Sequence, residues 1–311
     1  MFLETKNSRI QKVNFSEIEN SQVSVFIKRE DELHPFISGN KYRKLKYNLE
    51  EAVRLKKETL LTFGGAYSNH IAATAAAGFE HNFKTIGVIR GDELATDIDF
   101  VLNKNPTLKF AAEHNMQFHF VSRKDYRNKT TPEFIADLKE KFGDFYLVPE
   151  GGTNKFAIKG CEEILTEADD QFNVICSSVG TGGTISGIIN ATKKHQKVIG
   201  FPALKGDFLQ NEIKKWVTKN NNWSLNTNYH FGGYAKVSEE LITFINKFKQ
   251  ETKIPLDPVY TGKMIFGLVT LIKKGYFEKG TKILAIHTGG LQGIDGMNLV
   301  LKKKKLPLIK Y

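Results

Sequence analysis

The sequence has few cysteines and no long apolar runs. Its 311 residues include only two cysteines, Cys161 and Cys176, which lack metal-site spacing and are too few for a disulfide scaffold. We therefore expect a reducing environment, an inert core thiol at Cys176 and no bound metal. No apolar run approaches membrane-spanning length, and the first six residues show no signal-peptide core. These absences favour a cytoplasmic protein without a membrane partner.

Acidic residues are outnumbered by basic ones, 34 to 45, which gives a formal net charge of +11. One interpretation of this excess is nucleic-acid binding, but the basic residues are spread thinly rather than gathered in a patch. The exception, the four lysines at 302–305, is typical of a solvated tail. We expect no nucleic-acid partner, and a general positive potential that attracts anionic cofactors and substrates.

Repeats and low-complexity linkers are absent as well, and strands alternate with helical segments along the chain. Periodicity predicts strands at 23–28, 59–63, 85–89, 117–121, 173–179, 197–201 and 282–287, and helices after Asn40 and at 68–77, 185–191 and 241–248, the second ended by Gly78. This pattern predicts an α/β protein with open, mainly parallel twisted sheets flanked by helices. Ligands of such sheets lie at the carboxyl ends of strands. Glycines fall at three predicted strand ends, at 64–65, 180–184 and 288–290.

The glycine loop at 180–184 is suited to phosphate. Glycines let backbone N–H groups approach the oxygens, the following helix adds its positive end, and Thr181 and Thr184 add hydroxyl donors. The loop lacks the Gly-Lys-Ser/Thr of a Walker A motif and the third glycine of a dinucleotide fingerprint. A plain strand-to-helix turn is the structural alternative.

Lys41, in the run Gly39-Asn40-Lys41-Tyr42-Arg43-Lys44, offers an amine that could form a Schiff base. Such a lysine needs a lowered pKa, which burial or the neighbouring cations Arg43 and Lys44 would provide. A chain with such an amine and a phosphate cradle could hold a phosphorylated aldehyde both covalently and ionically. Pyridoxal phosphate is a cofactor with this chemistry.

Two further segments allow either a structural or a functional interpretation. Ser68 or Asn69, in Tyr67-Ser68-Asn69-His70, would cap the alanine-rich helix or bind a substrate carboxylate. Tyr260, in Asp257-Pro258-Val259-Tyr260-Thr261-Gly262-Lys263, would be structural, stack on a ring or donate a proton.

In this order and spacing, these segments resemble the pyridoxal-phosphate enzymes of the tryptophan-synthase-β fold, known as fold type II. Within that family the sequence is most similar to the branch of 1-aminocyclopropane-1-carboxylate deaminase and D-cysteine desulfhydrase. The resemblance runs from about residue 28 to residue 291. Besides the segments above, it includes Gly233-Tyr234 and His287-Thr288-Gly289-Gly290.

The resemblance implies a set of site residues. Lys41 would carry the cofactor and shuttle protons, Asn69 would bond its ring oxygen, and Thr288 would face its pyridine nitrogen. The phosphate would be held by Lys44, Thr181, Gly182, Gly183 and Thr184.

The resemblance also implies where the substrate would lie. Its carboxylate would meet Ser68, Asn69 and His70, and Ser68 is also a candidate base. Tyr234 and Tyr260 would flank the reacting carbon.

The resemblance further implies a domain organisation and an assembly. Residues 1–45 and 148–311 would form a larger, cofactor-anchoring domain, and residues 46–147 a smaller inserted one, with the cofactor between them. A homodimer is expected.

One departure from the family bears on the substrate. Ring-opening deaminases typically have Glu after the tyrosine that matches Tyr260, whereas this chain has Thr261. A carboxylate near the pyridine nitrogen would strengthen the electron sink more than a hydroxyl does. His70, where ring-opening enzymes tend to have Gln, points the same way, while Phe231-Gly232-Gly233-Tyr234-Ala235-Lys236 matches neither pattern.

We therefore predict a lyase acting on a small amino acid. The preferred reaction is α,β-elimination from D-cysteine to a keto acid, ammonia and sulfide. The alternative is a 1-aminocyclopropane-1-carboxylate deaminase, which would release 2-oxobutanoate and ammonia. A remote alternative is a non-catalytic binder of a phosphorylated ligand, which would be colourless.

Overall fold

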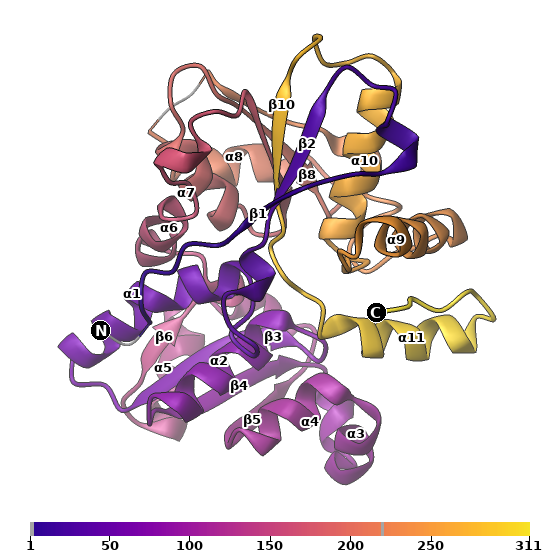
Figure 1. The fold of residues 1–311 in the computed structure, drawn as a ribbon. Helices are drawn as coiled ribbons and strands as arrows, with labels where there is room; N and C mark the ends of the chain where they lie inside the picture. The colour runs from indigo at the N-terminus through magenta and orange to yellow at the C-terminus, as the bar shows by residue number, and fades with distance from the viewer. Residues whose placement is uncertain (1–2, 219–220) are drawn as a thin grey trace.

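Two sheets organise the chain, of which the computed structural model describes residues 3–218 and 221–311 (Figure 1). The larger sheet has the order β1-β2-β10-β7-β8-β9, and the smaller has the order β5-β4-β3-β6. All strand pairs are parallel except β1 with β2. The larger sheet contains β1 (Ile10–Lys12), β2 (Ser24–Lys28), β7 (Val174–Val179), β8 (Lys197–Pro202), β9 (Trp223–Leu225) and β10 (Lys282–Ile286). The smaller contains β3 (Thr59–Gly65), β4 (Lys84–Arg90), β5 (Met116–Val121) and β6 (Tyr146–Val148). The predicted mainly parallel α/β architecture is confirmed.

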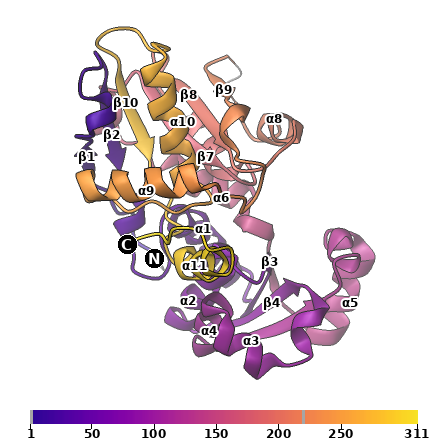
Figure 2. The ribbon, with the colours of Figure 1, turned by 90° about the vertical axis from the view of Figure 1, so that its right-hand side faces the viewer.

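Helices join and flank the strands (Figures 1 and 2). They are α1 (Asn40–Arg54), α2 (Asn69–Glu80), α3 (Ile98–Lys104), α4 (Pro106–Glu113), α5 (Pro132–Phe142), α6 (Lys155–Glu162), α7 (Gly183–Ala191), α8 (Phe208–Lys214), α9 (Glu239–Thr252), α10 (Thr261–Lys273) and α11 (Gly293–Lys303). Within the described residues, no helix combines the length and the apolar character needed to cross a bilayer.

The predicted strands and helices are all present, but the predicted end of one helix is wrong. Helix α2 continues through Gly78 to Glu80. A side-chain carbon at Gly78 would lie 2.1 Å from Thr85 Cγ2, so this glycine lets α2 pack closely on β4. A glycine required for packing has been mistaken for a helix stop, which sequence alone cannot distinguish.

Helix α1 lies between the two sheets in both views (Figures 1 and 2). Its apolar face, Leu45, Leu49 and Ala52, is fully buried in a cluster that also contains β3, β6 and α2 residues. Its other side meets α6, where a side-chain carbon at Gly160 would lie 1.9 Å from the Arg43 carbonyl oxygen. Because α1 packs on both parts of the molecule, the domain boundaries near 46 and 147 stay a prediction.

The chain end beyond the lysine run at 302–305 packs against the fold. Ile309 is buried in the core cluster around the larger sheet. Asn298 holds it in place, with Nδ2 donating to the Ile309 carbonyl at 3.0 Å and Oδ1 accepting its N–H at 2.9 Å. The lysines themselves are exposed, as expected of a solvated surface.

Candidate functional site

Lys41 is the second residue of α1, whose start lies beside the segment that follows β10. The turn at Gly39 has φ +63°, and a side-chain carbon there would lie 2.1 Å from the Thr288 carbonyl oxygen, so only glycine permits this contact. Burial lowers the pKa of Lys41 to about 7, and the nearby Lys44 cation acts in the same direction. An amine with this pKa is substantially neutral at physiological pH, as a Schiff-base lysine requires.

Arg43 does not take part in lowering the pKa of Lys41, contrary to one of our expectations. Its guanidinium is turned away into an ion pair with the buried Glu30, with Nε–Oε2 at 2.9 Å and Nη2–Oε1 at 3.0 Å. Lys44 alone of the two candidates acts on Lys41.

Lys44 is a buried cation that contacts neutral oxygen atoms. Its Nζ donates to the Gly151 carbonyl oxygen at 2.8 Å and to Thr153 Oγ1 at 3.1 Å, and it lies 3.5 Å from Thr181 Oγ1. Among the residues that the structure describes, it forms no ion pair, and burial lowers its pKa to about 8. A desolvated cation surrounded by neutral oxygens is the arrangement expected where an anion binds.

The glycine loop forms the opposite wall of this anion site. Gly182 has φ +86° and starts α7, whose first N–H groups have no side-chain cap. A side-chain carbon at Gly183 would lie 2.7 Å from Thr153 Oγ1 and 3.1 Å from Lys44 Nζ. Unpaired amides at a helix start next to a buried ammonium suit a phosphate.

Two loop threonines link this wall to its surroundings. The hydroxyls of Thr181 and Thr153 are 2.6 Å apart. Asn40 Nδ2 donates to Thr184 Oγ1 at 2.7 Å, which ties the loop to the residue before Lys41. The structure therefore brings Lys41, Lys44 and the glycine loop together.

Ser68 begins α2 and caps it, as one of the two interpretations predicted. Its Oγ accepts the N–H groups of His70 at 3.2 Å and Ile71 at 3.4 Å, and its own hydroxyl proton remains available. Asn69 faces the segment after β10, because a side-chain carbon at Gly290 would lie 2.9 Å from Asn69 Nδ2. Both side chains are partly exposed.

His70 is placed differently from the other two residues of its motif. Its ring is buried, and Nε2 lies 2.8 Å from Thr62 Oγ1, whose own proton goes to the Val148 carbonyl. Nε2 is therefore the donor. Burial, with the charges of Lys41 and Lys44, holds the pKa of His70 well below its ordinary value. The side chain is a neutral interior group, so a role in carboxylate binding would fall to its backbone.

Tyr260 and Tyr234 meet over the glycine loop. Their ring centroids are 6.2 Å apart at 65°, and a side-chain carbon at Gly180 would lie 3.2 Å from Tyr260 Cε1. Burial raises the pKa of Tyr260 well above its ordinary value. Desolvation of the Tyr234 hydroxyl raises its pKa as well, although the residue as a whole is 45% exposed. Both tyrosines keep their protons at neutral pH.

Thr288 is paired with another hydroxyl, since its Oγ1 lies 3.0 Å from Ser178 Oγ at the end of β7. Thr261 is fully committed elsewhere. Its hydroxyl donates to Asp257 Oδ1 at 2.7 Å and accepts the Asp257 N–H at 2.9 Å. Asp257 in turn accepts the N–H groups of Val259, Tyr260 and Thr261 and thereby caps α10.

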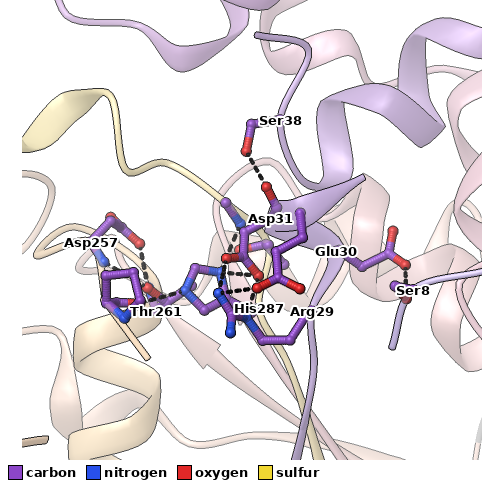
Figure 3. A network of polar contacts seen from close by, with 12 residues as sticks. Ser8, Arg29, Glu30, Asp31, Ser38, Asp257, Thr261 and His287 are labelled. Atoms are coloured by element: carbon purple, nitrogen blue, oxygen red, sulfur yellow. Dashed lines mark hydrogen bonds and ion pairs between the residues drawn. The ribbon is translucent and has the colours of Figure 1, made fainter. Parts of the chain in front are cut away.

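A polar network beneath the site fixes these segments relative to one another (Figure 3). Asp31 accepts both Nε and Nη2 of Arg29, at 2.9 and 2.7 Å, and lies 3.3 Å from His287 Nδ1. His287 Nε2 donates to the Pro255 carbonyl at 2.7 Å, and Ser38 Oγ donates to the Asp31 carbonyl at 3.2 Å. The network joins the chain before Lys41, the end of β10 and the approach to Tyr260.

Three contributors to the site were not predicted from the sequence. Gly151 and Thr153, which contact Lys44, follow β6, so the strand-end glycine rule used for the other loops would have found them. Lys263 is buried, and its Nζ donates to two loop carbonyls, at 2.9 and 2.8 Å. It ends the segment 257–263, but no role was predicted for it.

Comparisons with known proteins identify the family of the chain. A family model described as pyridoxal-phosphate dependent enzyme matches residues 3–289. A mitochondrial protein of Arabidopsis thaliana named bifunctional D-cysteine desulfhydrase/1-aminocyclopropane-1-carboxylate deaminase is 32% identical, covering 87% of this chain and 73% of that protein. A putative 1-aminocyclopropane-1-carboxylate deaminase of Pyrococcus furiosus is 31% identical, covering 86% and 85%. The crystal structure of an ACC deaminase homologue, 28% identical, gives a TM-score of 0.79 and covers 97% of this chain and 95% of that one.

Proposed function

The chain belongs to the family of pyridoxal-phosphate-dependent enzymes, in the group of 1-aminocyclopropane-1-carboxylate deaminase and D-cysteine desulfhydrase, and we propose that it eliminates sulfide from D-cysteine. It is a lyase or deaminase whose cofactor is pyridoxal phosphate. The proposed reaction converts D-cysteine and water into a three-carbon keto acid, ammonia and hydrogen sulfide.

The residues present fit this cofactor. Lys41 supplies an amine with a pKa of about 7. Lys44 and the amides of Gly182 and Gly183 would hold the phosphate, with Thr181 and Thr184 beside them. Asn69 would reach the ring oxygen, and Thr288 with its partner Ser178 would meet the pyridine nitrogen. When bound, the cofactor supplies an electron sink conjugated to the amino group of the substrate.

The chain's own groups would bind the substrate and move protons. Ser68 and the start of α2 would bind the carboxylate through a free hydroxyl proton and the positive end of the helix. Lys41 would accept and return a proton at Nζ, since its pKa lies close to neutral pH. Tyr260 and Tyr234, both protonated, would donate towards the departing sulfur.

The hydrogen bonds between Thr261 and Asp257 support elimination of sulfide over ring opening. The hydroxyl of Thr261 is bound on both sides by Asp257, and the carboxylate of Asp257 already accepts four hydrogen bonds. No carboxylate in this segment is therefore free to keep the pyridine nitrogen protonated. A neutral hydroxyl pair at Thr288 and Ser178 gives a weaker sink, which suffices to expel a good leaving group such as sulfide but is less suited to breaking a carbon–carbon bond.

Ring opening of 1-aminocyclopropane-1-carboxylate is the second candidate, because the relatives carry both names. Purified enzyme loaded with the cofactor is incubated with D-cysteine, L-cysteine and the cyclopropane substrate, and sulfide, keto acid and ammonia are measured. We expect sulfide from D-cysteine and little 2-oxobutanoate. Turnover of the cyclopropane substrate alone would overturn the proposal.

The assembly and domain division are also part of this proposal. The smaller sheet is built only from strands between residues 59 and 148, which supports an inserted domain at 46–147. A homodimer, a cytoplasmic location and the absence of a nucleic-acid partner remain predictions.

A further inference from the structure

Lys263 is a buried lysine in an unfavourable place. It is the third residue of α10, where the helix has its positive end, and it is 2% exposed. Among the described residues it forms no ion pair within 4.0 Å. Burial lowers its pKa to about 8, and the charge of Asp257 opposes that effect. A cation kept here against burial and the helix dipole needs a compensating role.

The partners of Lys263 are two carbonyl oxygens of one loop. Its Nζ donates to His230 O at 2.9 Å and to Gly233 O at 2.8 Å. Each of these carbonyls also closes a tight turn, since Gly233 N–H donates to His230 O at 3.0 Å and Lys236 N–H donates to Gly233 O at 3.1 Å. Lys263 therefore joins two consecutive turns at their closing bonds.

The loop at 230–236, which Lys263 joins in this way, has several residues with positive φ. Phe231, Gly232, Gly233 and Ala235 all have positive φ, at 53°, 90°, 117° and 54°. Phe231 and Ala235 carry side chains, for which this region costs energy. One end of the loop is anchored by Phe231 on Phe266 of α10, with centroids 5.0 Å apart. At the other end, the Tyr234 ring contacts Tyr260 but the residue stays 45% exposed, and Ala235 is exposed.

Tyr234 is held within the second turn, between the Gly233 and Lys236 that close it. From there its ring meets Tyr260, which in turn covers Gly180 of the glycine loop. The two ammonium bonds, together with the Gly232 N–H bond to His230 Nδ1 at 2.9 Å, restrain a loop with a strained backbone. This loop is also the segment that matches neither branch of the family.

We propose that Lys263 is a positioning residue, which holds the turns at 230–236 so that Tyr234 is presented to Tyr260 at the substrate site. The inference rests on the proposed function, in which Tyr234 flanks the reacting carbon. Lys263 acts through the loop and does not touch the substrate.

Lys263→Met tests the proposal, because methionine keeps most of the volume and removes all donors. The first measurement is hydrogen exchange at 230–236 in the cofactor-loaded enzyme without substrate. Losing charge-assisted bonds should speed exchange of the Gly233 and Lys236 amides about tenfold or more. Lys236→Met, which removes an exposed lysine of the same loop, is the matched control and should change nothing. Unchanged exchange in Lys263→Met would overturn the proposal.

A double-mutant cycle tests the link to catalysis. Lys263→Met should lower kcat about tenfold to a hundredfold while the cofactor absorbance is retained, because a misplacement of about 1 Å has effects of this size. In a Tyr234→Phe background the same change should cost little, and Lys263→Arg should restore part of the activity. Equal losses in both backgrounds would overturn the role through Tyr234. If Tyr234→Phe is fully active while exchange still depends on Lys263, the proposed role of Tyr234 fails and the restraint stands.

Discussion

Replacing Lys44 with methionine should weaken cofactor binding without unfolding the protein. The ammonium lies among neutral oxygens, at 2.8 Å from the Gly151 carbonyl and 3.1 Å from Thr153 Oγ1. A hydrogen bond to a charged group contributes about 1.5–3 kcal/mol. Since about 1.4 kcal/mol corresponds to a factor of ten, the dissociation constant of pyridoxal phosphate should rise about tenfold to 150-fold.

The assay is equilibrium binding of the cofactor to the cofactor-free protein. Lys46→Met is the matched control on the same helix, because the Lys46 ammonium is already neutralised by Glu163 at 2.8 Å. That control should lower the melting temperature and leave the dissociation constant unchanged. The reasoning is refuted if Lys44→Met binds the cofactor as tightly as the unaltered protein.

The same lysine predicts a pH dependence of the cofactor-free protein. The folded pKa of Lys44 is about 8, below its ordinary value of 10.5, so the unfolded state binds more protons between these values. The free energy of unfolding should therefore rise as pH increases through about 8. Lys44→Met should show a smaller rise than the unaltered protein when both are followed by denaturant unfolding.

Three further outcomes follow from the site geometry. Gly183→Ala should lower the melting temperature, because the new methyl would lie 2.7 Å from Thr153 Oγ1 and clashes of this kind cost about 1–3 kcal/mol of stability. It should also weaken cofactor binding about tenfold, because the methyl would lie 3.1 Å from Lys44 Nζ in the proposed phosphate cradle; equal affinity would contradict the cradle. Thr261→Glu should destabilise the fold by about 3 kcal/mol or more rather than confer ring opening, because the added carboxylate would be buried against Asp257. Thr261→Ser is the control. A stable Thr261→Glu variant with gained ring-opening activity would contradict this prediction. Loading of the cofactor-free protein should accelerate as pH rises through about 7, where the Lys41 amine becomes neutral, and a pH-independent rate would argue against that amine.

The sequence was sufficient to predict the residues that meet at strand ends. The loop at 180–184 was predicted from glycines after a buried strand, and parallel strands place such ends at one edge of a sheet. Lys41 was predicted from its run as a Schiff-base amine, and the phosphate role of Lys44 was implied by the resemblance. The structure explains two residues of the Lys41 motif: Gly39 allows the close approach to Thr288, and the Asn40 side chain bonds Thr184 of the glycine loop.

Other features depend on packing that no local pattern encodes. Arg43 looks equivalent to Lys44 in the sequence, yet it faces Glu30 on the far side of α1. Lys263 was one lysine within a recognised motif, and its loop partners are about thirty residues earlier in the chain. Thr261 was identified as a departure, but its closed pair with Asp257 appears only in three dimensions.

The most direct test of the account is the position of the covalent bond to the cofactor. The loaded enzyme is treated with borohydride, digested, and the reduced pyridoxyl label is located by mass spectrometry. The account predicts the label on Lys41 and a Lys41→Ala protein that acquires none. A label on Lys44 or on any other lysine, or a labelled Lys41→Ala protein, would contradict it.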